Sequence, residues 1–553
     1  MDTERRASTT VITLRILAIL LIAAAVLRTA WVSDDALITL RSALNFTHGW
    51  GPGFNATEAV QAYTHPLWFL LWVSLGELTN QWILGILAAS VVFTATAVGL
   101  LVWRTRSVAM IIVATGLLLL SNAFIEYATS GLENPLSYLL IGTLLALTFT
   151  VDWASVGDVV GPRRYAFPTL TGLLIAAVLL TRMDLALLIG PVVVLLIVRS
   201  RRSPRTLVVA ITAAVLPFLA WFSWSWVTYS TLLPNTFLAK RNVDIPTGEL
   251  VVQGLRYLWV SAEHDPVTLI GLALGITVAL LSRSVTGRVW AAGVLLYIGY
   301  SIWIGGDFMA GRFFAVPVYV AVFLLVAVTP DPTRGATDTT GELQHASVAV
   351  AVASVALLLV GTVAAGIPPT SVANPASARW EVDQNINAGV SDERGIYVAN
   401  GRSLEGLIDN LSLAFVTPNI VPIGDGTGLN RTLRDLDKEA KDWPDAPSDF
   451  TLPSEVGVFC GFLGTIGMAT GPITHIIDPC ALTDRYLADR PYAPASPFAW
   501  KPGHFAREIP PGYVEAVRTG DATMVEDPLD EFALKELWTR IRPVTEPENR
   551  GTP

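Results

Sequence analysis

Two adjacent aspartates, Asp34 and Asp35, follow the first long apolar stretch of the chain. Ser33 suits the N-cap of a helix that runs through Ala43, and acids in the first turn of a helix are stabilised by its dipole. Two carboxylates beside a membrane helix can also hold a divalent metal ion, or act as a general base and its partner. We therefore predict that Asp34 and Asp35 are catalytic as well as capping residues. Which of them is base, nucleophile or metal ligand stays open.

The segment that begins with the two aspartates continues through a tight turn and ends with two side chains that carry rings, Tyr63 and His65. Glycines and a proline shape the turn between Gly49 and Gly53, and the segment closes with Tyr63 and His65. We predict that Tyr63 and His65 face a substrate. The alternative for the histidine is a hydrogen-bonded structural role.

Three more segments carry charge at or near the depth of predicted membrane helices, namely Leu180–Asp184, Leu232–Lys240 and Gly305–Arg312. Charged groups there are unfavourable unless they face protein or a wet cavity, and a lipid phosphate would suit the cations. Arg182 and Asp184 could instead pair with each other, and the lysine of the second segment could anchor to lipid headgroups. The predicted donor-phosphate and substrate-binding residues are Tyr63, His65, Arg182, Asp184, Asn235, Lys240, Asp307, Arg312, His504 and Arg507.

The composition limits the class of protein that can carry these residues. The 553-residue chain is 52% hydrophobic and only 15% charged, whereas a typical soluble protein is about 25% charged. Up to Gly366 it has 21 Lys/Arg and 19 Asp/Glu, and from Ile367 onward 16 and 27, so the net charge of −9 divides into +2 and −11. These numbers exclude a single soluble enzyme, a nucleic-acid binder with a basic face and a disordered chain. They leave a multi-pass membrane protein with an acidic soluble domain.

Long apolar stretches predict about eleven membrane-crossing helices. Residues 64–80 are interpreted as an interfacial helix on the outer leaflet, because leaving them out of the count puts the arginine-rich loops in the cytoplasm. With a cytoplasmic N-terminus, eleven crossings place the C-terminal domain outside. The predicted spans are 11–30, 82–103, 107–125, 135–151, 165–181, 185–198, 206–227, 266–282, 289–304, 313–329 and 346–366.

The predicted organisation is a transmembrane domain over 1–366, whose first outer loop 31–81 carries the acidic pair, and an extracytoplasmic mixed α/β domain over 367–553. In the second domain the apolar patterns predict strands at Gly395–Val398 and Val456–Cys460, and helices at Leu404–Leu413 and Leu529–Ile541. The only cysteines, Cys460 and Cys480, both lie in it. An oxidising compartment permits a disulfide between them, and two buried free thiols are the alternative.

Signatures of soluble enzymes are absent from the sequence. It has no Walker-type phosphate loop, no His-Glu-x-x-His, no Gly-x-Ser-x-Gly and no Cys-x-x-Cys. The alternative of another class is a transporter or a non-catalytic envelope scaffold. Transporters usually have internal repeats and ionisable groups near the midplane, whereas here no repeat is found and the ionisable groups gather at the predicted outer ends of the helices.

Short motifs in a fixed order run through nearly the whole chain: Trp31–Ala36, Tyr63–Trp68, Thr129–Glu133, Leu233–Thr236, Gly306–Met309, Leu482–Asp484 and Trp500–Tyr513. With the acidic pair, the many spans and the outer C-terminal domain, they resemble the GT-C glycosyltransferases. Within that superfamily the motifs resemble the terminal β-(1→2)-arabinofuranosyltransferase family of mycolic-acid-bearing bacteria.

This resemblance implies a GT-C fold in the bacterial plasma membrane with an extracytoplasmic active site. It implies decaprenyl-phosphoryl arabinofuranose as the donor, the non-reducing end of arabinan in arabinogalactan or lipoarabinomannan as the acceptor, and no nucleic-acid partner. No nucleotide cofactor is expected, and a divalent metal ion at the acidic pair is the one cofactor to consider. Another polyprenyl-phosphate sugar, such as mannose, is the alternative donor. Donor and product are both β, so configuration is retained either through a carboxylate nucleophile or through attack on the face of departure.

Overall fold

The chain folds into two compact units that are interleaved along the sequence. The computed structural model describes residues 2–153, 155, 161, 163–241, 243–329, 353, 386–387, 389–399, 433–493 and 502–542. Unit 1 comprises Met1–Trp31, Leu87–Phe218 and Pro246–Ala399, and unit 2 comprises Val32–Ile86, Leu219–Ile245 and Asn400–Pro553. The segment with the acidic pair therefore belongs to the same unit as most of the C-terminal region.

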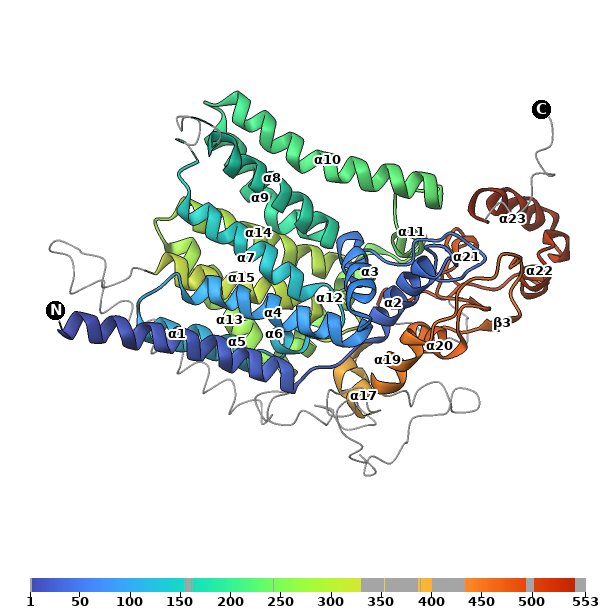
Figure 1. Ribbon diagram of the computed structural model, residues 1–553, viewed down its shortest axis with the longest axis horizontal. Helices are drawn as coiled ribbons and strands as arrows, with labels where there is room; N and C mark the ends of the chain where they lie inside the picture. Colours follow the sequence, from blue (N-terminus) through green and yellow to red (C-terminus); the bar gives the residue numbers. More distant parts are fainter. Residues whose placement is uncertain are drawn as a thin grey trace. The chain divides into compact units, whose positions relative to one another are not determined.

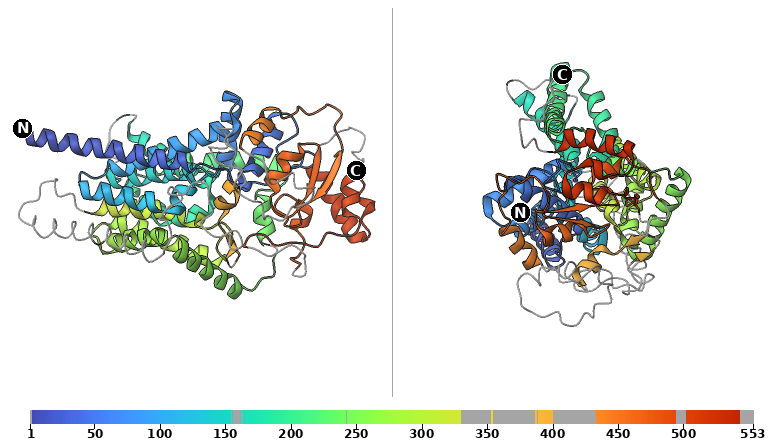
Figure 2. Two further views of the ribbon diagram at one scale, coloured as in Figure 1. Left: turned by 90° about the horizontal axis from the view of Figure 1, so that it is seen from below. Right: turned by 90° about the vertical axis from the view of Figure 1, so that its right-hand side faces the viewer.

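Unit 1 consists almost entirely of helices in its described residues (Figures 1 and 2). Two of its helices, α4 and α10, each have one end that belongs to unit 2. The elements are α1 (Asp2–Arg28), α4 (Trp82–Val102), α5 (Val108–Leu120), α6 (Asn122–Glu126), α7 (Asn134–Thr150), α8 (Arg163–Thr181), the 3₁₀ turn η2 (Met183–Leu185), α9 (Ala186–Ser200), α10 (Pro204–Tyr229), α12 (Thr247–His264), α13 (Pro266–Leu281), α14 (Val285–Trp303), α15 (Arg312–Val328), α17 (Glu393–Ala399) and the antiparallel pair β1 (Ile386–Asn387) and β2 (Val390–Ser391).

Each predicted span that falls in the described residues coincides with an apolar helix. By length and composition, six described helices can cross a membrane, or seven if α12 and α13, which are bent by 107°, count as one span. Helix α5 is shorter than the span predicted at 107–125, whereas α7 and α15, with 17 residues each, have the predicted lengths and belong with α5 to the shorter apolar helices. The predicted span 346–366 lies outside the described residues except for residue 353. The prediction of a helical multi-pass membrane protein whose C-terminal region holds a small sheet is confirmed.

Glycines let the helices of unit 1 pack closely. A Cβ on Gly275 of α13 would lie 2.1 Å from the Ala321 carbonyl oxygen of α15, and one on Gly293 of α14 would lie 2.0 Å from the Leu188 carbonyl oxygen of α9. Neither site has room for a side chain. Small residues at such contacts are how apolar helices bring their backbones together in a membrane.

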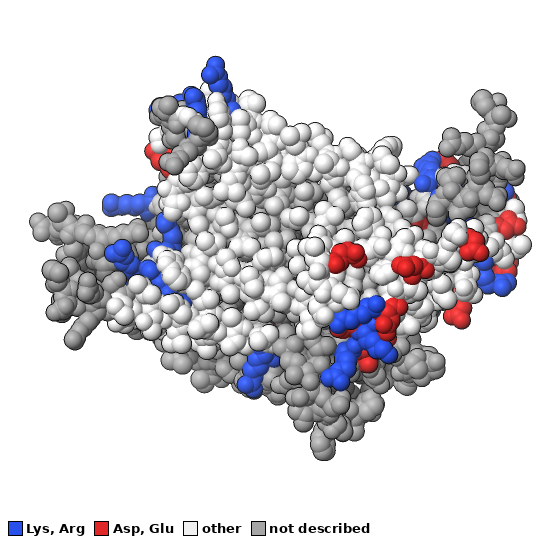
Figure 3. Space-filling model, in the orientation of Figure 1, with Lys and Arg blue, Asp and Glu red and all other residues white. Residues whose placement is uncertain are grey.

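The two ends of the unit 1 bundle differ in charge. The connections α4–α5, α9–α10 and α13–α14 carry arginines, and helix α8 begins with Arg163 and Arg164; all of these lie at one end. Figure 3 shows Lys and Arg side chains gathered at that end of the unit, with a broad face free of charge beyond them. The connections at the opposite end carry the acidic and basic residues that the sequence singled out.

Unit 2 combines short helices with a two-stranded sheet, and these elements pack around a hydrophobic core of their own. Its elements are α2 (Asp34–Thr47), α3 (Pro66–Thr79), α11 (Asn235–Arg241), α19 (Leu433–Lys441), β3 (Glu455–Val458), α20 (Leu463–Thr470), β4 (Thr474–Ile477), α21 (Arg485–Ala488), α22 (Tyr513–Thr519), the 3₁₀ turn η4 (Ala522–Met524) and α23 (Pro528–Ile541). The strands β3 and β4 are parallel, with Val458 opposite Ile477, and α20 is the connection between them. Leu487, Val517 and Leu534 from α21, α22 and α23 are fully buried in one hydrophobic cluster.

Two expectations from the sequence differ from the fold. The strand predicted at Gly395–Val398 is wrong, because these residues lie in helix α17. The carboxylate of Asp392 accepts a hydrogen bond from the Gly395 amide and so starts that helix; a short apolar run alone does not distinguish strand from helix. The amphipathic helix α12 was not predicted. The helix expected at Leu404–Leu413 lies outside the described residues, while β3 and α23 match the strand and helix predicted there.

Candidate functional site

The acidic pair opens helix α2, as the sequence predicts. The Ser33 hydroxyl accepts a hydrogen bond from the Ala36 amide at 3.3 Å and caps the helix. Asp34 is 6% exposed, and its carboxylate receives hydrogen bonds from the far end of the sequence: from the Gly464 amide at 2.9 Å, from the Thr465 amide at 2.8 Å, and from the Thr465 hydroxyl. One member of the pair is therefore held by the N-terminus of α20.

A buried arginine fixes the same two helices along their length. Arg41 of α2 is fully buried and donates to the carbonyl oxygens of Phe54, Gly467 and Thr474 at 2.9, 2.8 and 2.8 Å. Burial lowers the pKa of Arg41 to about 9. Because its three acceptors include Gly467 within α20 and Thr474 at the start of β4, this side chain joins the first loop to the β3–α20–β4 segment.

Tyr63 and His65 are both buried in unit 2. The Tyr63 hydroxyl lies 2.8 Å from that of Tyr229, and its ring stacks on Phe69 with centroids 4.3 Å apart. The His65 Nε2 lies 2.8 Å from the Thr39 hydroxyl of α2. Burial raises the pKa of Tyr63 well above its ordinary value, so the hydroxyl stays protonated.

A second group of predicted residues gathers around α11. The Asn235 side-chain amide donates to the carbonyl oxygens of Ala481, Leu482 and Asp484 at 2.8, 3.2 and 3.2 Å. Arg507, 2% exposed, donates to the carbonyl oxygens of Ala239 and Phe505. These contacts tie α11 to the loops on either side of α21.

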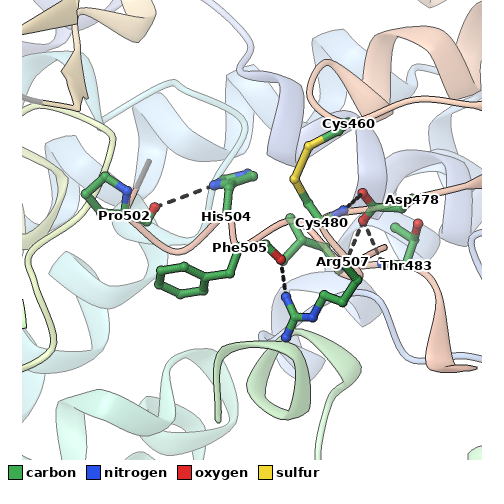
Figure 4. The surroundings of a disulfide bond; sticks show 9 residues. Cys460, Asp478, Cys480, Thr483, Pro502, His504, Phe505 and Arg507 are labelled. Carbon is green, nitrogen blue, oxygen red and sulfur yellow. Dashed lines mark hydrogen bonds between the residues drawn. A yellow bond between two sulfur atoms is a disulfide. The ribbon is translucent and has the colours of Figure 1, made fainter. Parts of the chain in front are cut away.

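The disulfide lies beside this group (Figure 4). Cys460 and Cys480 follow the carboxyl ends of the parallel strands β3 and β4, and the structure joins their sulfurs. The Asp478 carboxylate accepts amide hydrogen bonds from Cys480 at 2.8 Å and Leu482 at 2.6 Å, although burial raises its pKa to about 6. His504 is buried nearby, with Nδ1 3.5 Å from the Pro502 carbonyl oxygen.

The Lys240 ammonium lies against the same turn, because a Cβ on Gly503 would be 3.1 Å from its Nζ. Asn235, Lys240, His504 and Arg507 therefore share one region of unit 2.

Among the residues that the structure describes, the acidic pair does not belong to a group of three Cys, His, Asp or Glu side chains that could hold a metal ion. Both Asp34 oxygens accept hydrogen bonds from α20. Within the described ranges, Cys, His, Asp and Glu side chains converge as a group of three only at Cys460, Asp478 and Cys480, where the two sulfurs are already bonded to each other. We therefore derive no chemical step through a metal ion.

The pH dependence of unit 2 should be set in part by His475. Its Nδ1 lies 2.8 Å from the Thr57 hydroxyl, and burial lowers its pKa to about 3 from an ordinary value of about 6.5. As the pH falls below about 6.5, the histidine becomes protonated in the unfolded chain but stays neutral in the folded protein. Protonation therefore favours the unfolded chain, so the folded protein keeps its full stability above about pH 6.5 and loses stability as the pH falls. Between pH 7.5 and pH 5 we expect a loss of about 2 kcal/mol from this group.

Thermal unfolding in detergent at the two pH values measures this loss. The His475→Gln variant should show a smaller fall in melting temperature than the unsubstituted protein, because all other titrating groups are shared. Equal falls in both proteins would show that His475 does not set the pH dependence.

In unit 1 the charged residues of the other segments form one buried cluster. Arg182 pairs with Asp184, with Nη2 2.6 Å from Oδ2, and the Tyr297 hydroxyl donates to the same carboxylate oxygen at 2.7 Å. Arg312 lies 3.7 Å from Asp307. The mutual pairing of Arg182 and Asp184 that the sequence left open is thus present.

Glu133 joins the two arginines. Its Oε1 lies 3.6 Å from Arg182 Nε and 3.6 Å from Arg312 Nη2, and its side chain is 2% exposed. We call the set Glu133, Arg182, Asp184, Asp307 and Arg312 the ionic cluster. Two guanidinium groups face three carboxylates in it, so the cluster holds hydrogen-bond donors and acceptors together. Lys240, predicted beside these arginines, belongs to unit 2.

The loop that carries Asp307 and Arg312 is held by its backbone. The Tyr257 hydroxyl donates to the Met309 carbonyl oxygen at 3.1 Å, and the Tyr127 hydroxyl donates to that of Ala310 at 3.0 Å. Ser391 of β2 adds two backbone hydrogen bonds to the same loop. A Cβ on Gly306, whose φ is +72°, would lie 2.5 Å from the Tyr257 Cβ, so only glycine fits at this position of the loop.

An apolar cavity of about 450 Å³ lies beside the cluster in the same unit. Two neighbouring residues of α15 relate the cavity to the cluster: Phe314 lines the cavity, and the Phe313 ring lies 5.7 Å from the Arg182 guanidinium. The Phe314 ring also packs on that of Tyr257, with centroids 5.2 Å apart. The lining comes from α12, α13, α14 and α15 and includes Leu255, Trp259, Leu272, Ile276 and Ile298.

Two residues of these sites were missed by sequence reasoning. Glu133 lies in a motif that the resemblance used, and an acid next to a predicted span is a signal that could have identified it. Thr465 has no such signal, because its role depends on a hydrogen bond across 431 residues of sequence.

Comparison with solved structures gives loose likenesses. The crystal structure of ArnT from Cupriavidus metallidurans bound to undecaprenyl phosphate is 15% identical, covers 70% of this chain and 68% of its own, and has a TM-score of 0.39. The archaeal oligosaccharyltransferase AglB from Archaeoglobus fulgidus, in complex with an inhibitory peptide and a dolichol-phosphate, is 12% identical, covers 85% and 65%, and has a TM-score of 0.44. Both scores are low, and the function proposed below rests on neither likeness.

Comparison with curated proteins is more specific. No family model matches the chain. A terminal β-(1→2)-arabinofuranosyltransferase from Corynebacterium glutamicum is 29% identical over 354 residues, which is 54% of this chain and 48% of that protein. One of the same name from Mycobacterium tuberculosis is 26% identical over 338 residues, 52% of this chain and 51% of that protein. The chain thus spans about half the length of the curated relatives it matches, and both of these relatives are named terminal β-(1→2)-arabinofuranosyltransferases.

Proposed function

We propose that the chain is a membrane glycosyltransferase of the GT-C type that moves arabinofuranose from decaprenyl-phosphoryl arabinofuranose to the non-reducing end of cell-wall arabinan, forming terminal β-(1→2) linkages. The similarity to two transferases of that name supports the reaction. The observation that carries the proposal is the ionic cluster beside an apolar cavity, since a polar head and an apolar tail describe a lipid-linked sugar.

The ionic cluster would hold the head of the donor. A phosphorylated pentose offers anionic oxygens, which accept from guanidinium groups, and hydroxyls, which donate to carboxylates. Arg182 Nη1 is buried and has no hydrogen-bond partner within the described residues, so its N–H groups are available to donate to an oxygen of the donor phosphate. The leaving phosphate carries its charge already, and a fixed cation stabilises that charge in place.

The acidic pair would act on the acceptor. A sugar hydroxyl is a weak nucleophile, and a carboxylate that removes its proton accelerates the attack. Retention of the β configuration would follow from a carboxylate nucleophile in two displacements, or from attack on the face that the phosphate leaves. Asp34 and Asp35 are our candidates for these roles.

The charge difference between the two ends of unit 1 supports the orientation we propose. Basic connections prefer the cytoplasmic side of a membrane. The end with the arginine-rich connections would then be cytoplasmic, and the end with the ionic cluster extracytoplasmic, where a polyprenyl-linked donor and a cell-wall acceptor meet.

A transfer assay with purified protein tests the function. We expect labelled pentose to move from decaprenyl-phosphoryl arabinofuranose to a synthetic arabinan oligosaccharide, and none to move from a polyprenyl-phosphate mannose. Transfer of mannose alone would retain the enzyme class and overturn the sugar. Transfer from neither donor would overturn the proposed function.

A further inference from the structure

We propose that helix α20 is a positioning element for the acidic pair and that Thr465 is a positioning residue that acts through Asp34. This inference rests on the proposed function for its catalytic readout. It extends that function to a segment of the sequence more than four hundred residues away from the pair, a separation of 431 residues between Asp34 and Thr465.

The hydrogen bonds to Asp34 are the first reason. The Ser33 hydroxyl caps α2 itself, which leaves the Asp34 carboxylate available to another element. Both of its oxygens are used by α20, Oδ2 by the Gly464 amide and Oδ1 by the amide and hydroxyl of Thr465. A carboxylate that accepts three hydrogen bonds at the N-terminus of a second helix has one orientation.

The close approach of the two helices is the second reason. A Cβ on Gly464 would lie 2.1 Å from the Asp34 carbonyl oxygen and 2.7 Å from the Leu37 Cβ. A Cβ on Gly467 would lie 2.7 Å from Arg41 Nη1. Glycine at 464 lets the backbone of α20 rest directly on the backbone of α2, and glycine at 467 leaves room for the Arg41 side chain that lies between the two elements.

Fixing Asp34 also fixes the direction of Asp35. Neighbouring residues on a helix point about 100° apart around its axis, since each turn holds about 3.6 residues. A clamp on the first residue of α2 sets the rotation of the first turn, and with it the direction in which the second carboxylate leaves the helix. The position of α20 therefore governs both acids.

The test is the kinetics of matched variants of the full-length protein in detergent. Thr465→Val removes the hydroxyl but keeps the amide, and should lower kcat about tenfold, with the KM for donor and acceptor unchanged. Thr465→Ser restores the hydroxyl and should return kcat to within about twofold. Thr470→Val is the control, because the Thr470 hydroxyl only donates to the Ile466 carbonyl oxygen in the same helix.

Gly464→Ala tests the close approach. It should lower kcat about 100-fold, since small displacements of catalytic groups have effects of that size. Gly299→Ala on α14 is its control, because a Cβ there has open space. Unchanged kcat in both Thr465→Val and Gly464→Ala would overturn the inference, as would a loss in Thr465→Val that serine does not restore.

A second readout separates this inference from the proposed function. If the unsubstituted protein transfers no sugar, the proposed function fails, and thermal unfolding of Asp34→Asn, Thr465→Val and the double variant still tests the contact. We expect the double variant to lose less melting temperature than the sum of the two single losses. Additive losses would overturn the inference whatever the reaction is.

Discussion

Asparagine in place of Asp34 or Asp35 should lower sugar transfer by at least about 100-fold, because an amide cannot take the proton of the acceptor hydroxyl or attack the donor as a nucleophile. For Asp34 a second effect adds to this. Its two oxygens accept hydrogen bonds from three donors on α20. Asparagine has only one side-chain oxygen, so it cannot accept all the hydrogen bonds that the two oxygens of Asp34 accept from Gly464 and Thr465. Initial rates with a labelled donor measure the loss.

Asp244→Asn is the matched control, since Asp244 is an exposed aspartate of the same unit. All three variants should elute from a sizing column in detergent as the unsubstituted protein does. Full activity in both Asp34→Asn and Asp35→Asn would contradict the role of the acidic pair. It is also the result that an envelope scaffold predicts.

Glu133→Gln should reduce kcat/KM for the donor by about 100-fold. The carboxylate lies 3.6 Å from each of Arg182 and Arg312 and is 2% exposed, so its charge is shared by two buried cations. Removing one partner of a buried ion pair costs about 3 kcal/mol or more of free energy. If that cost weakens binding of the donor in the transition state, kcat/KM falls by a factor of about 100. Donor-dependence curves with purified protein measure it.

Glu249→Gln is the control for this change, because Glu249 is an exposed glutamate in the first turn of α12. We expect its kcat/KM to stay within about twofold of the unsubstituted value, as is usual for exposed charges. A Glu133→Gln variant with the same donor dependence as this control would show that the ionic cluster has only a structural role.

The membrane helices were predictable because hydropathy is a local property. Each span predicted in the described residues coincides with a helix, from α1 at the N-terminus to α15. The run Gly395–Val398 shows the limit of that reasoning: three apolar residues in a row fit a strand or a helix, and one hydrogen bond from the Gly395 amide to Asp392 decides for a helix.

The candidate sites were predictable in their charged residues but not in their partners. Arg182, Asp184, Asp307 and Arg312 stand out as charges beside apolar runs, and the structure brings them together. The partners of Asp34 depend on contacts between segments far apart in the sequence, and no periodicity or spacing reports such contacts. Arg41 is a further example, since its acceptors at Gly467 and Thr474 lie in another part of the chain.

The central claim is that the chain binds and uses a polyprenyl-phosphate pentose. Mass spectrometry of the lipid that purifies with the protein from its native membrane tests this most directly, since it reads the length of the isoprenoid, the phosphate and the mass of the sugar together. We predict a decaprenyl phosphate that carries one pentose, and its loss in Glu133→Gln. A polyprenyl phosphate with a hexose, or a lipid without an isoprenoid chain, would contradict the account.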